Sequence, residues 1–434
     1  MSILFSSLLF SCVNHHEAAE VSGATKPDES SSGYSSSLLY TGQERMYALP
    51  GADQGIGQRE KVGALTWEHI GAARFAKEPK PWDEPVWDDG QSTHEPFYGM
   101  HKVDAQGRLW KVVDVDRPLL DRGIAQYDLM ALGEEMAFQQ VSGAVDSGEP
   151  DTGVEDAVED TEGGWFEFES FTQVSCTSST TTNHVWDQGG QEDVIVTSEM
   201  NTYETDPIVA IDTYWHGGCS GVLVRSDVVL SAAHCFIDST GAFAGLPSSY
   251  KFCTRGNWED ATPDCSLGSG QYVNPSVNDD EPSAKHDWVL IELEDAIGGS
   301  DNKMYFSSVS SATIRSSELY LGGYPTIWRS DPSCISNWRE ERSANTEYME
   351  GSRLHLAEGE AATVYTKSLR LNVTHGNGYS GGPYFYDPGD EGGRRYVVGV
   401  HSSNNPPWNT AAGARASYWR SEWISVITDG LWSY

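Results

Sequence analysis

Residues 375–383 read HGNGYSGGP, and the interpretation of the rest of the chain starts from this stretch. Ser380 lies among glycines, so the backbone can turn sharply there and direct its amide N–H groups at one neighbouring atom. Clusters of Gly, Ser and Pro also mark ordinary turns. On its own the stretch therefore indicates either a turn or a reactive serine, and other parts of the chain have to decide.

Two other stretches favour the reactive serine. Residues 219–235, CSGVLVRSDVVLSAAHC, indicate two short apolar strands around an Arg-Ser-Asp turn, followed by a histidine next to a cysteine. Residues 285–293, KHDWVLIEL, place an aspartate before another apolar strand, where its carboxylate can be buried beside an imidazole. The chain thus carries His234, Asp287 and Ser380 in that order.

This order, together with the Ala-Ala-His-Cys box and the Gly-x-Ser-Gly-Gly-Pro string, resembles the chymotrypsin-like serine proteases. The resemblance implies that Ser380 is the nucleophile and that His234 is the base that removes its proton. Asp287 would accept the second imidazole N–H and hold the correct tautomer. The backbone N–H groups of Gly378 and Ser380 would form the oxyanion hole. We therefore expect a serine endopeptidase that forms an acyl-enzyme and needs no cofactor and no metal.

The second half of the chain is expected to be an all-β domain. From residue 194 to 434, short apolar and β-branched segments alternate with Gly, Asn, Asp and Pro turns. The resemblance supplies the form, which is two antiparallel six-stranded Greek-key β-barrels with the active site between them. His234 and Asp287 are expected on the first barrel and Ser380 on the second. Residues 418–429 have apolar side chains at helical spacing and indicate a C-terminal helix packed on a barrel.

The 434 residues exceed one protease domain, so a second region is expected before it. Residues 38–142 have ordinary globular composition and helical spacing near their end, but they carry no catalytic constellation. By position alone, this region is predicted to be a propeptide or accessory region of uncertain fold. Residues 143–164 are acidic and indicate a disordered linker, and residues 165–193 would form the end of the propeptide.

The chain begins with an apolar run that is too short to span a bilayer. It predicts a signal peptide over residues 1–20, followed by a serine-rich tether over residues 21–37. Residues 9–12 resemble a bacterial lipobox, which would make Cys12 a lipidated residue. A lipid anchor on Cys12 and plain secretion with cleavage nearby stay open as alternatives. Both predict a secreted or cell-surface protein that contacts a membrane only through such an anchor.

Net charge limits the classes of partner that the protein can bind, and the cysteines indicate the compartment in which it folds. The formal net charge of −36 argues against nucleic acid, because its phosphates would be repelled. We expect protein or peptide substrates and, by default, a monomer. An even set of six cysteines in an extracellular protein predicts disulfide bonds. The resemblance places the pair Cys219–Cys235 beside the candidate histidine. Cys253 and Cys265 would close a local loop, which leaves Cys176 and Cys334 as the third pair.

Within the family, three stretches are similar to the bacterial glutamyl endopeptidases. They are Cys-Ser-Gly at residues 219–221, Gly-Tyr-Pro at residues 323–325 and Val-Gly-Val-His at residues 398–401. The residue six before the serine is Thr374, where trypsin has Asp, so no buried carboxylate awaits Lys or Arg.

These relatives imply a set of substrate-binding residues. His401 matches the pocket histidine that receives a substrate carboxylate, whereas His375 stands where those enzymes usually have Thr. Two imidazoles near one pocket would bind Glu or Asp through charge-assisted hydrogen bonds. Alternatively, His375 fills the pocket and leaves a preference for small or apolar residues. Ser402 and Ser403 match the strand that pairs with the substrate backbone, and Thr374 completes the set.

The same relatives are activated by propeptide removal. The corresponding bond here lies between Asp193 and Val194, and an enzyme specific for acidic residues could cut it itself. One rival from another class remains open, a non-catalytic protease homologue that acts as a surface binding lipoprotein.

Overall fold

The computed structural model describes most of the chain after residue 45. For residues 132–142, 172–177, 182–187, 193–195, 355, 404, 405 and 410 the backbone alone is described. The signal peptide, tether and acidic linker, together with Cys12, Cys334 and Thr374, lie outside the described residues. The described ranges are 46–77, 100–142, 172–177, 182–187, 193–195, 207–213, 218–254, 264–274, 285–298, 303–324, 354–373, 375–376, 378–388, 394–405 and 410–428.

Six antiparallel strands form a first closed barrel. Their ring closes where β13 pairs with β14. Strands β11 and β12 hold long runs of buried Val and Leu on either side of the turn at Ser226 and Asp227, as the sequence predicts. The strands are β10 (Ile208–Asp212), β11 (Cys219–Arg225), β12 (Val228–Ser231), β13 (Lys251–Thr254), β14 (Asp264–Val273) and β15 (Val289–Leu293).

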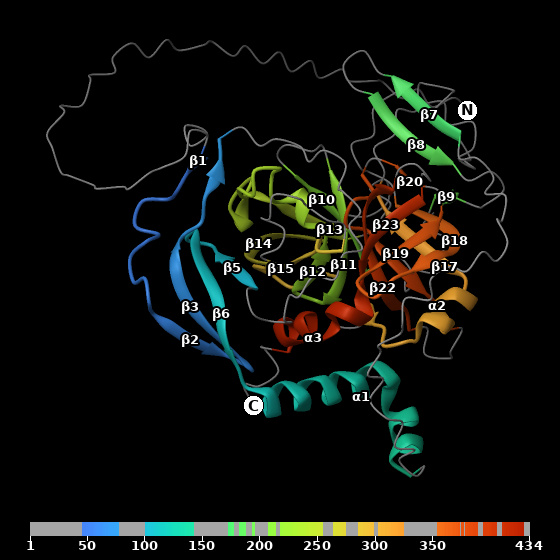
Figure 1. The fold of residues 1–434 in the computed structure, drawn as a ribbon, viewed down its shortest axis with the longest axis horizontal. Helices are drawn as coiled ribbons and strands as arrows, with labels where there is room; N and C mark the ends of the chain where they lie inside the picture. Colours follow the sequence, from blue (N-terminus) through green and yellow to red (C-terminus); the bar gives the residue numbers. More distant parts are fainter. Residues whose placement is uncertain are drawn as a thin grey trace, which may run out of the picture. The chain divides into compact units, whose positions relative to one another are not determined.

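A second barrel of six antiparallel strands closes where β22 pairs with β23. Both barrels connect their six strands in the same way. When the strands of each barrel are counted along the chain, the third pairs with the sixth and the first pairs with the fourth. This repeat confirms the predicted pair of six-stranded antiparallel barrels (Figure 1). The strands are β17 (Leu319–Gly323), β18 (His355–Val364), β19 (Ser368–Asn372), β21 (Pro383–Tyr386), β22 (Tyr396–Asn405) and β23 (Thr410–Arg415).

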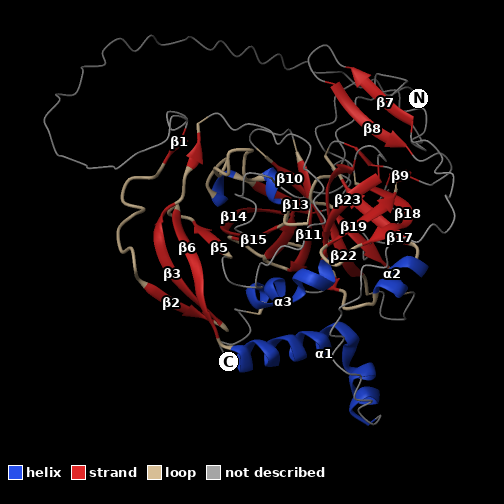
Figure 2. Ribbon diagram, viewed as in Figure 1, coloured by secondary structure: helices blue, strands red, loops and turns tan. Residues whose placement is uncertain are grey.

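Residues 46–77 and 100–131, called the N-terminal region below, continue the sheet of the first barrel. Beyond β14 the strand order runs β5, β6, β3 and β2, so one sheet contains ten strands (Figure 2). Four residues of β14, Gly270–Val273, pair with β5. The strands are β1 (Met46–Tyr47), β2 (Arg59–Val62), β3 (Leu65–Ala72), β4 (Phe75–Ala76), β5 (His101–Asp104) and β6 (Arg108–Val115).

Side chains cross the boundary between the N-terminal region and the first barrel. The ring of Trp67 packs edge-on against Tyr272 at a centroid distance of 5.6 Å, and Phe75 contacts Phe243 at 6.2 Å. One continuous hydrophobic core therefore contains residues of the N-terminal region, the first barrel and the C-terminal helix. A second core cluster fills the other barrel.

Helix α1 (Arg117–Ser142) begins earlier than its apolar spacing indicates. Asp116 precedes it as the N-cap, and its carboxylate accepts a hydrogen bond from the N–H of Leu119 at 3.2 Å. Pro118 in the first turn needs no hydrogen-bond partner for its nitrogen, which suits that position.

The C-terminal helix α3 (Ala416–Ile427) confirms the predicted helix. It contacts α1, and the phenol oxygen of Tyr127 in α1 accepts a hydrogen bond from the N–H of Phe306 at 2.7 Å. Tyr396 donates to the carbonyl of Ala131 at 2.9 Å. Arg420 of α3 forms an ion pair with Asp128 of α1.

Shorter elements complete the fold. Strand β9 (Asp193–Ile195) pairs with β18, β16 (Tyr305–Phe306) runs parallel to β22, and α2 (Ser311–Ser316) begins at the Ser310 N-cap. A separate three-stranded sheet contains β7 (Thr172–Thr177), β8 (Thr182–Asp187) and β20 (His375–Gly376).

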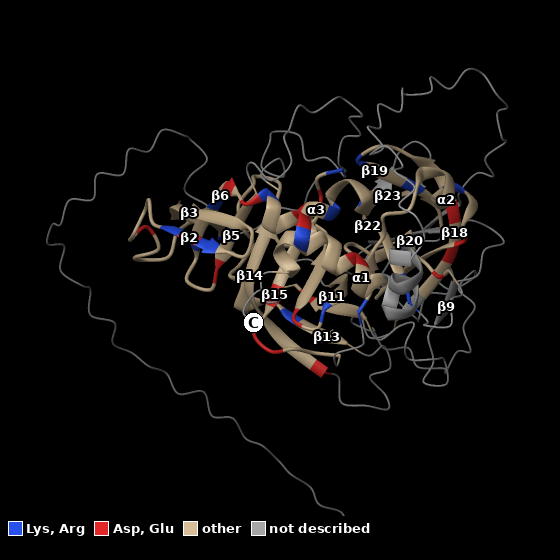
Figure 3. Cartoon of the chain, turned by 90° about the horizontal axis from the view of Figure 1, so that it is seen from below, with Lys and Arg blue, Asp and Glu red and all other residues tan. Residues whose placement is uncertain are grey.

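Charged residues of both signs lie close together on β2, β3, β5 and β6 (Figure 3). Two ion pairs involve β2, one joining Arg59 to Glu68 of β3 at 2.7 Å and the other joining Lys61 to Asp116, the N-cap of α1, at 2.8 Å. Among the described residues, no helix is long and apolar enough to cross a membrane.

Candidate active site

His234 lies in a short 3-10 helix, Ala233–Cys235, that follows β12. The disulfide bond between Cys219 and Cys235 fastens this turn to the start of β11, as predicted. The second predicted local bond, Cys253–Cys265, joins β13 to β14. The side chain of Cys176 is not described, so the third predicted pair lies outside what the structure describes.

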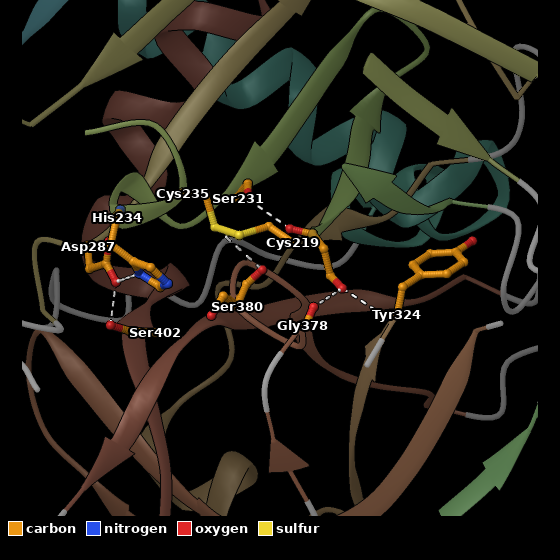
Figure 4. Close-up of a disulfide and its surroundings, with 10 residues drawn as sticks. Cys219, Ser231, His234, Cys235, Asp287, Tyr324, Gly378, Ser380 and Ser402 are labelled. Atoms are coloured by element: carbon orange, nitrogen blue, oxygen red, sulfur yellow. Dashed lines mark hydrogen bonds and ion pairs between the residues drawn. A yellow bond between two sulfur atoms is a disulfide. The ribbon is translucent and has the colours of Figure 1, made fainter. Parts of the chain in front are cut away.

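Asp287 is fully buried two residues before β15 begins and faces His234. One carboxylate oxygen accepts the backbone N–H of His234 at 2.8 Å, and the other lies 2.6 Å from Nδ1 of its ring. The hydroxyl of Ser402 also donates to this second oxygen (Figure 4). Because an ionised carboxylate can only accept hydrogen bonds, the Nδ1 proton of His234 points at Asp287 and Nε2 is left to act as a base.

The C-terminal helix holds the segment that carries Asp287. The indole N–H of Trp419 donates to the carbonyl of Lys285 at 2.8 Å. The Trp419 ring also packs against Trp288 and His286, with centroids 5.5 and 5.6 Å away. These contacts fix the residues on both sides of Asp287, so α3 helps to position the carboxylate although it carries no candidate catalytic side chain.

Ser380 lies in the loop before β21 of the second barrel, and Ser220 of the first barrel ties down this loop. The N–H of Ser220 donates to the carbonyl of Ser380 at 2.7 Å, and its hydroxyl donates to the carbonyl of Gly378 at 2.7 Å. The same hydroxyl accepts the N–H of Tyr324 at 2.8 Å. Sγ of Cys235 lies 3.9 Å from the Ser380 carbonyl, but a disulfide sulfur carries no proton and this is only a packing contact.

The loop needs glycine next to the serine. Gly381 has φ of +83°, and a Cβ atom there would lie 2.0 Å from the Ser231 hydroxyl and 2.3 Å from the Ser220 carbonyl. Gly378 is also left-handed, with φ of +93°. Within the described part of the chain, the N–H groups of Gly378 and Ser380 donate no hydrogen bond. Both are the groups predicted to form the oxyanion hole.

Two further predicted residues, His375 of β20 and His401 of β22, lie side by side. Both are buried, and their rings meet nearly edge-to-face at a centroid distance of 5.6 Å. Nδ1 of His375 lies 2.8 Å from the carbonyl of Val373, and Nδ1 of His401 lies 2.6 Å from the hydroxyl of Tyr384. The backbone of His401 also pairs with the serine loop, donating to Gly382 and accepting from Gly381.

Burial controls the protonation of His401 and Tyr384. It lowers the pKa of His401 well below its usual value, and the neighbouring His375 and His234 lower it further. Burial also raises the pKa of Tyr384 well above its usual value. Both side chains are therefore uncharged at neutral pH.

The segment upstream of the predicted processing bond contacts this part of the site. Strand β8 pairs with β20, so that His375 is opposite Trp186 and Gly376 is opposite Val185. Asp193 and Val194 lie in β9, where they pair with Ala357 and Leu356 of β18. The backbone on both sides of the predicted bond is thus held against the second barrel.

Three functional contacts were missed from the sequence. Ser402 was assigned to substrate binding, yet its hydroxyl contacts Asp287. Ser220 was noted only as part of a similar stretch, and it bridges the two barrels. Tyr384 was given no role, because a tyrosine two residues after a Gly-Gly pair carries no signal of a buried histidine partner.

Comparison with known proteins identifies the class. A family model described as Trypsin matches residues 194–420, which is more than half of the chain. The chain belongs to the trypsin family.

One solved structure similar to this chain is that of a Glu endopeptidase in complex with MPD. It covers 55% of this chain and 97% of its own, with 16% sequence identity and a TM-score of 0.42. A search of the curated proteins gave no match.

Proposed function

We propose that the protein is a serine endopeptidase that hydrolyses peptide bonds through Ser380, His234 and Asp287. The observation that carries the proposal is the fully buried Asp287 carboxylate, which accepts both the backbone and the ring N–H of His234. A buried carboxylate paired with an imidazole, in a chain of the trypsin family, supports a base poised to activate a serine.

The reaction follows from the protonation of these groups. Nε2 of His234 takes the hydroxyl proton of Ser380 as the serine oxygen attacks the substrate carbonyl, and Asp287 stabilises the imidazolium that forms. The N–H groups of Gly378 and Ser380 stabilise the oxyanion, and one such donor contributes roughly 2.7–4 kcal/mol to lowering the barrier. The imidazolium then protonates the leaving amine. Water, activated by the same imidazole, hydrolyses the acyl-enzyme.

The experiment compares the full-length protein with Ser380→Ala on a mixed peptide library read by mass spectrometry. Wild-type protein should produce cuts that the variant lacks, while Ser417→Ala, a serine at the start of α3, should cut like wild type. Cuts that persist in Ser380→Ala would exclude this serine as the nucleophile. Identical, uncut libraries for wild type and variant, even after proteolytic removal of the upstream segment, would favour the non-catalytic binding protein.

For specificity, we propose a preference for Glu or Asp before the scissile bond, with His401 as the residue that receives the side chain. The closeness of His401 to the serine loop and to His375 supports this assignment. The alternative is a small or apolar preference, in which His375 fills the space. The library separates the two, because the first gives cuts after acidic residues and the second after Ala, Val, Leu or aromatic residues.

We further propose that the protein is secreted or held at the cell surface and is made as a zymogen cut between Asp193 and Val194. The pairing of β8 with β20 supports the zymogen, because the upstream segment adds a strand directly next to His375 and Gly376. N-terminal sequencing of the active protein should give a chain that begins at Val194. A fully active, intact chain with no new N-terminus between residues 185 and 205 would contradict the processing step.

A further inference from the structure

The contact between Tyr384 and His401 lies inside the second barrel and has no part in the triad. Tyr384 belongs to β21 and His401 to β22, which are neighbouring strands of the same barrel. Tyr384 is fully buried, and His401 is 3% exposed. The phenol oxygen lies 2.6 Å from Nδ1, and the two rings meet at 74° with centroids 5.7 Å apart. This geometry is that of a direct hydrogen bond in a water-poor environment.

The direction of this hydrogen bond follows from proton counting. If Nδ1–H donated to the phenol oxygen, the phenol proton would need another acceptor. Among the described residues, the hydroxyl of Tyr384 has no partner except Nδ1 of His401. A buried hydroxyl proton without an acceptor costs about 1–3 kcal/mol. Tyr384 therefore donates to Nδ1, and the single proton of the neutral His401 ring lies on Nε2.

The neighbouring His375 has the opposite tautomer. A carbonyl oxygen can only accept, so Nδ1–H of His375 donates to Val373 across the 2.8 Å contact. In the neutral ring, the lone pair of His375 is consequently on Nε2. The two neighbouring rings thus carry their protons on different nitrogens, Nε2 in His401 and Nδ1 in His375.

We propose that Tyr384 is a positioning residue that fixes His401 as a neutral Nε2–H donor, so that the site recognises a hydrogen-bond acceptor rather than a negative charge. This inference rests on the proposed endopeptidase function and names its substrate class as peptides with Glu or Gln before the scissile bond. A carboxylate and a carboxamide both end in an oxygen that can accept from Nε2–H.

A site that recognises the negative charge of a substrate would need His401 to be protonated to an imidazolium. The surroundings of His401 oppose that state. The titratable groups that face it are Tyr384 on β21, His375 on β20 and His234 in the 3-10 helix, and none of them is an anion at neutral pH. A proton on Nδ1 would also break the hydrogen bond from Tyr384 and leave two protons facing each other. Burial and the two other histidines act in the same direction by lowering the pKa of His401.

The first test compares two peptides that differ only in Glu or Gln before the scissile bond, between pH 6 and 9. A neutral donor predicts a Glu-to-Gln ratio of kcat/KM that is below about thirty and changes by less than about threefold over this range. Tyr384→Phe should raise KM for both peptides about tenfold and change kcat by less than threefold. Tyr386→Phe, which removes a hydroxyl from the same strand, should leave both values near wild type.

Kinetic outcomes distinguish the possibilities. If the ratio of kcat/KM for the Glu peptide to that for the Gln peptide fell tenfold for each unit of rising pH, a protonated His401 would be binding the substrate, and the inference would be overturned. Cleavage only after apolar residues would also overturn it while leaving the endopeptidase intact. If turnover were absent or unaffected by Ser380→Ala, the proposed function itself would fail.

The second test needs no turnover. Selective ¹⁵N-histidine labelling of full-length Ser380→Ala, with His401→Gln in the same background to assign the signals, reports which ring nitrogen carries the proton. We expect an Nε2-protonated ring with an unprotonated, hydrogen-bonded Nδ1 from pH 6 to 8. Adding Tyr384→Phe should shift the Nδ1 signal towards that of a nitrogen without a donor. An Nδ1-protonated ring, or a doubly protonated one at pH 7, would overturn the inference.

Discussion

The N-terminal region supplies four strands to the sheet of the first barrel but none of the candidate catalytic side chains, whereas loops at the barrel ends supply all of them. The match to the trypsin family begins at residue 194, yet the shared hydrophobic core already includes Leu65, Trp67 and Tyr127. The comparison teaches that the boundary of a catalytic family need not be the boundary of a folding unit. A few residues decide which catalytic family a chain belongs to, whereas the apolar area that a segment buries decides whether it folds as part of the same core.

The largest expected effect lies in the barrels and concerns rate alone. Asp287→Asn keeps the shape of the site but reverses the tautomer of His234, and we expect kcat to fall roughly 10⁴-fold. Asp227→Asn in the turn of the same barrel should leave kcat within twofold. Urea unfolding should show both variants to be folded like wild type. A loss of less than tenfold for Asp287→Asn would contradict its assigned role.

Tyr127→Ala tests the other side of the comparison. It removes a buried ring that stacks on Phe306 at 5.9 Å and leaves the Phe306 N–H without its acceptor. We expect unfolding to become easier by about 3–5 kcal/mol, measured by urea denaturation, with kcat per folded molecule unchanged. Leu129→Ala, at an exposed position of α1, should cost less than about 0.5 kcal/mol. Equal stabilities for the two variants would show that α1 is not part of the core.

Mild acid should loosen the junction between the two regions. Burial, assisted by Lys111, lowers the pKa of His101 to about 4, and this residue pairs with Val273 of β14. The unfolded chain takes up a proton near pH 6.5 and the folded chain does not, so stability is lost as the pH falls from 6.5 to 4. His101→Gln should remove up to roughly 3 kcal/mol of this pH dependence. The measurement is urea unfolding at pH 7 and 4.5, and an unchanged slope in the variant would rule out His101 as the cause.

The smallest effect is expected at the ion pair between the helices. Asp128 is 41% exposed and Arg420 is 11% exposed, so solvent screens much of their attraction. Asp128→Asn should therefore cost less than about 1 kcal/mol in urea, and the difference should shrink in 1 M salt. A cost as large as that of Tyr127→Ala would mean that charge, rather than apolar packing, holds α1 to α3.

The all-β class and the histidine–aspartate pair could be predicted because their signals are local, and the two barrels followed from the family resemblance that these motifs carry. The Ala-Ala-His-Cys box, the aspartate before an apolar strand and the glycines around Ser380 each occupy fewer than ten consecutive residues. Short apolar strands bounded by turn residues gave the class of fold, and the order of the motifs gave the family. The C-terminal helix followed from apolar spacing alone.

Contacts between distant segments could not be predicted in the same way. Nothing in the pattern of residues 101–104 indicates that they pair with residues 270–273, because strand pairing between distant segments leaves no local periodicity. The early start of α1 was missed although Asp116 and Pro118 are ordinary signals of a helix N-terminus. Ser402 and Tyr384 were missed because their partners come from other strands.

Strand β14 has one more consequence. Its first four residues close the first barrel against β13, but Gly270–Val273 pair with β5 instead. If the N-terminal region were lost, instead of staying bound after a cut before residue 194, the N–H and C=O groups of this half-strand that face β5 would be unpaired, while its other groups would still pair with β15. Such an open edge is a template for pairing with another copy, so the N-terminal region also protects the protein from self-association.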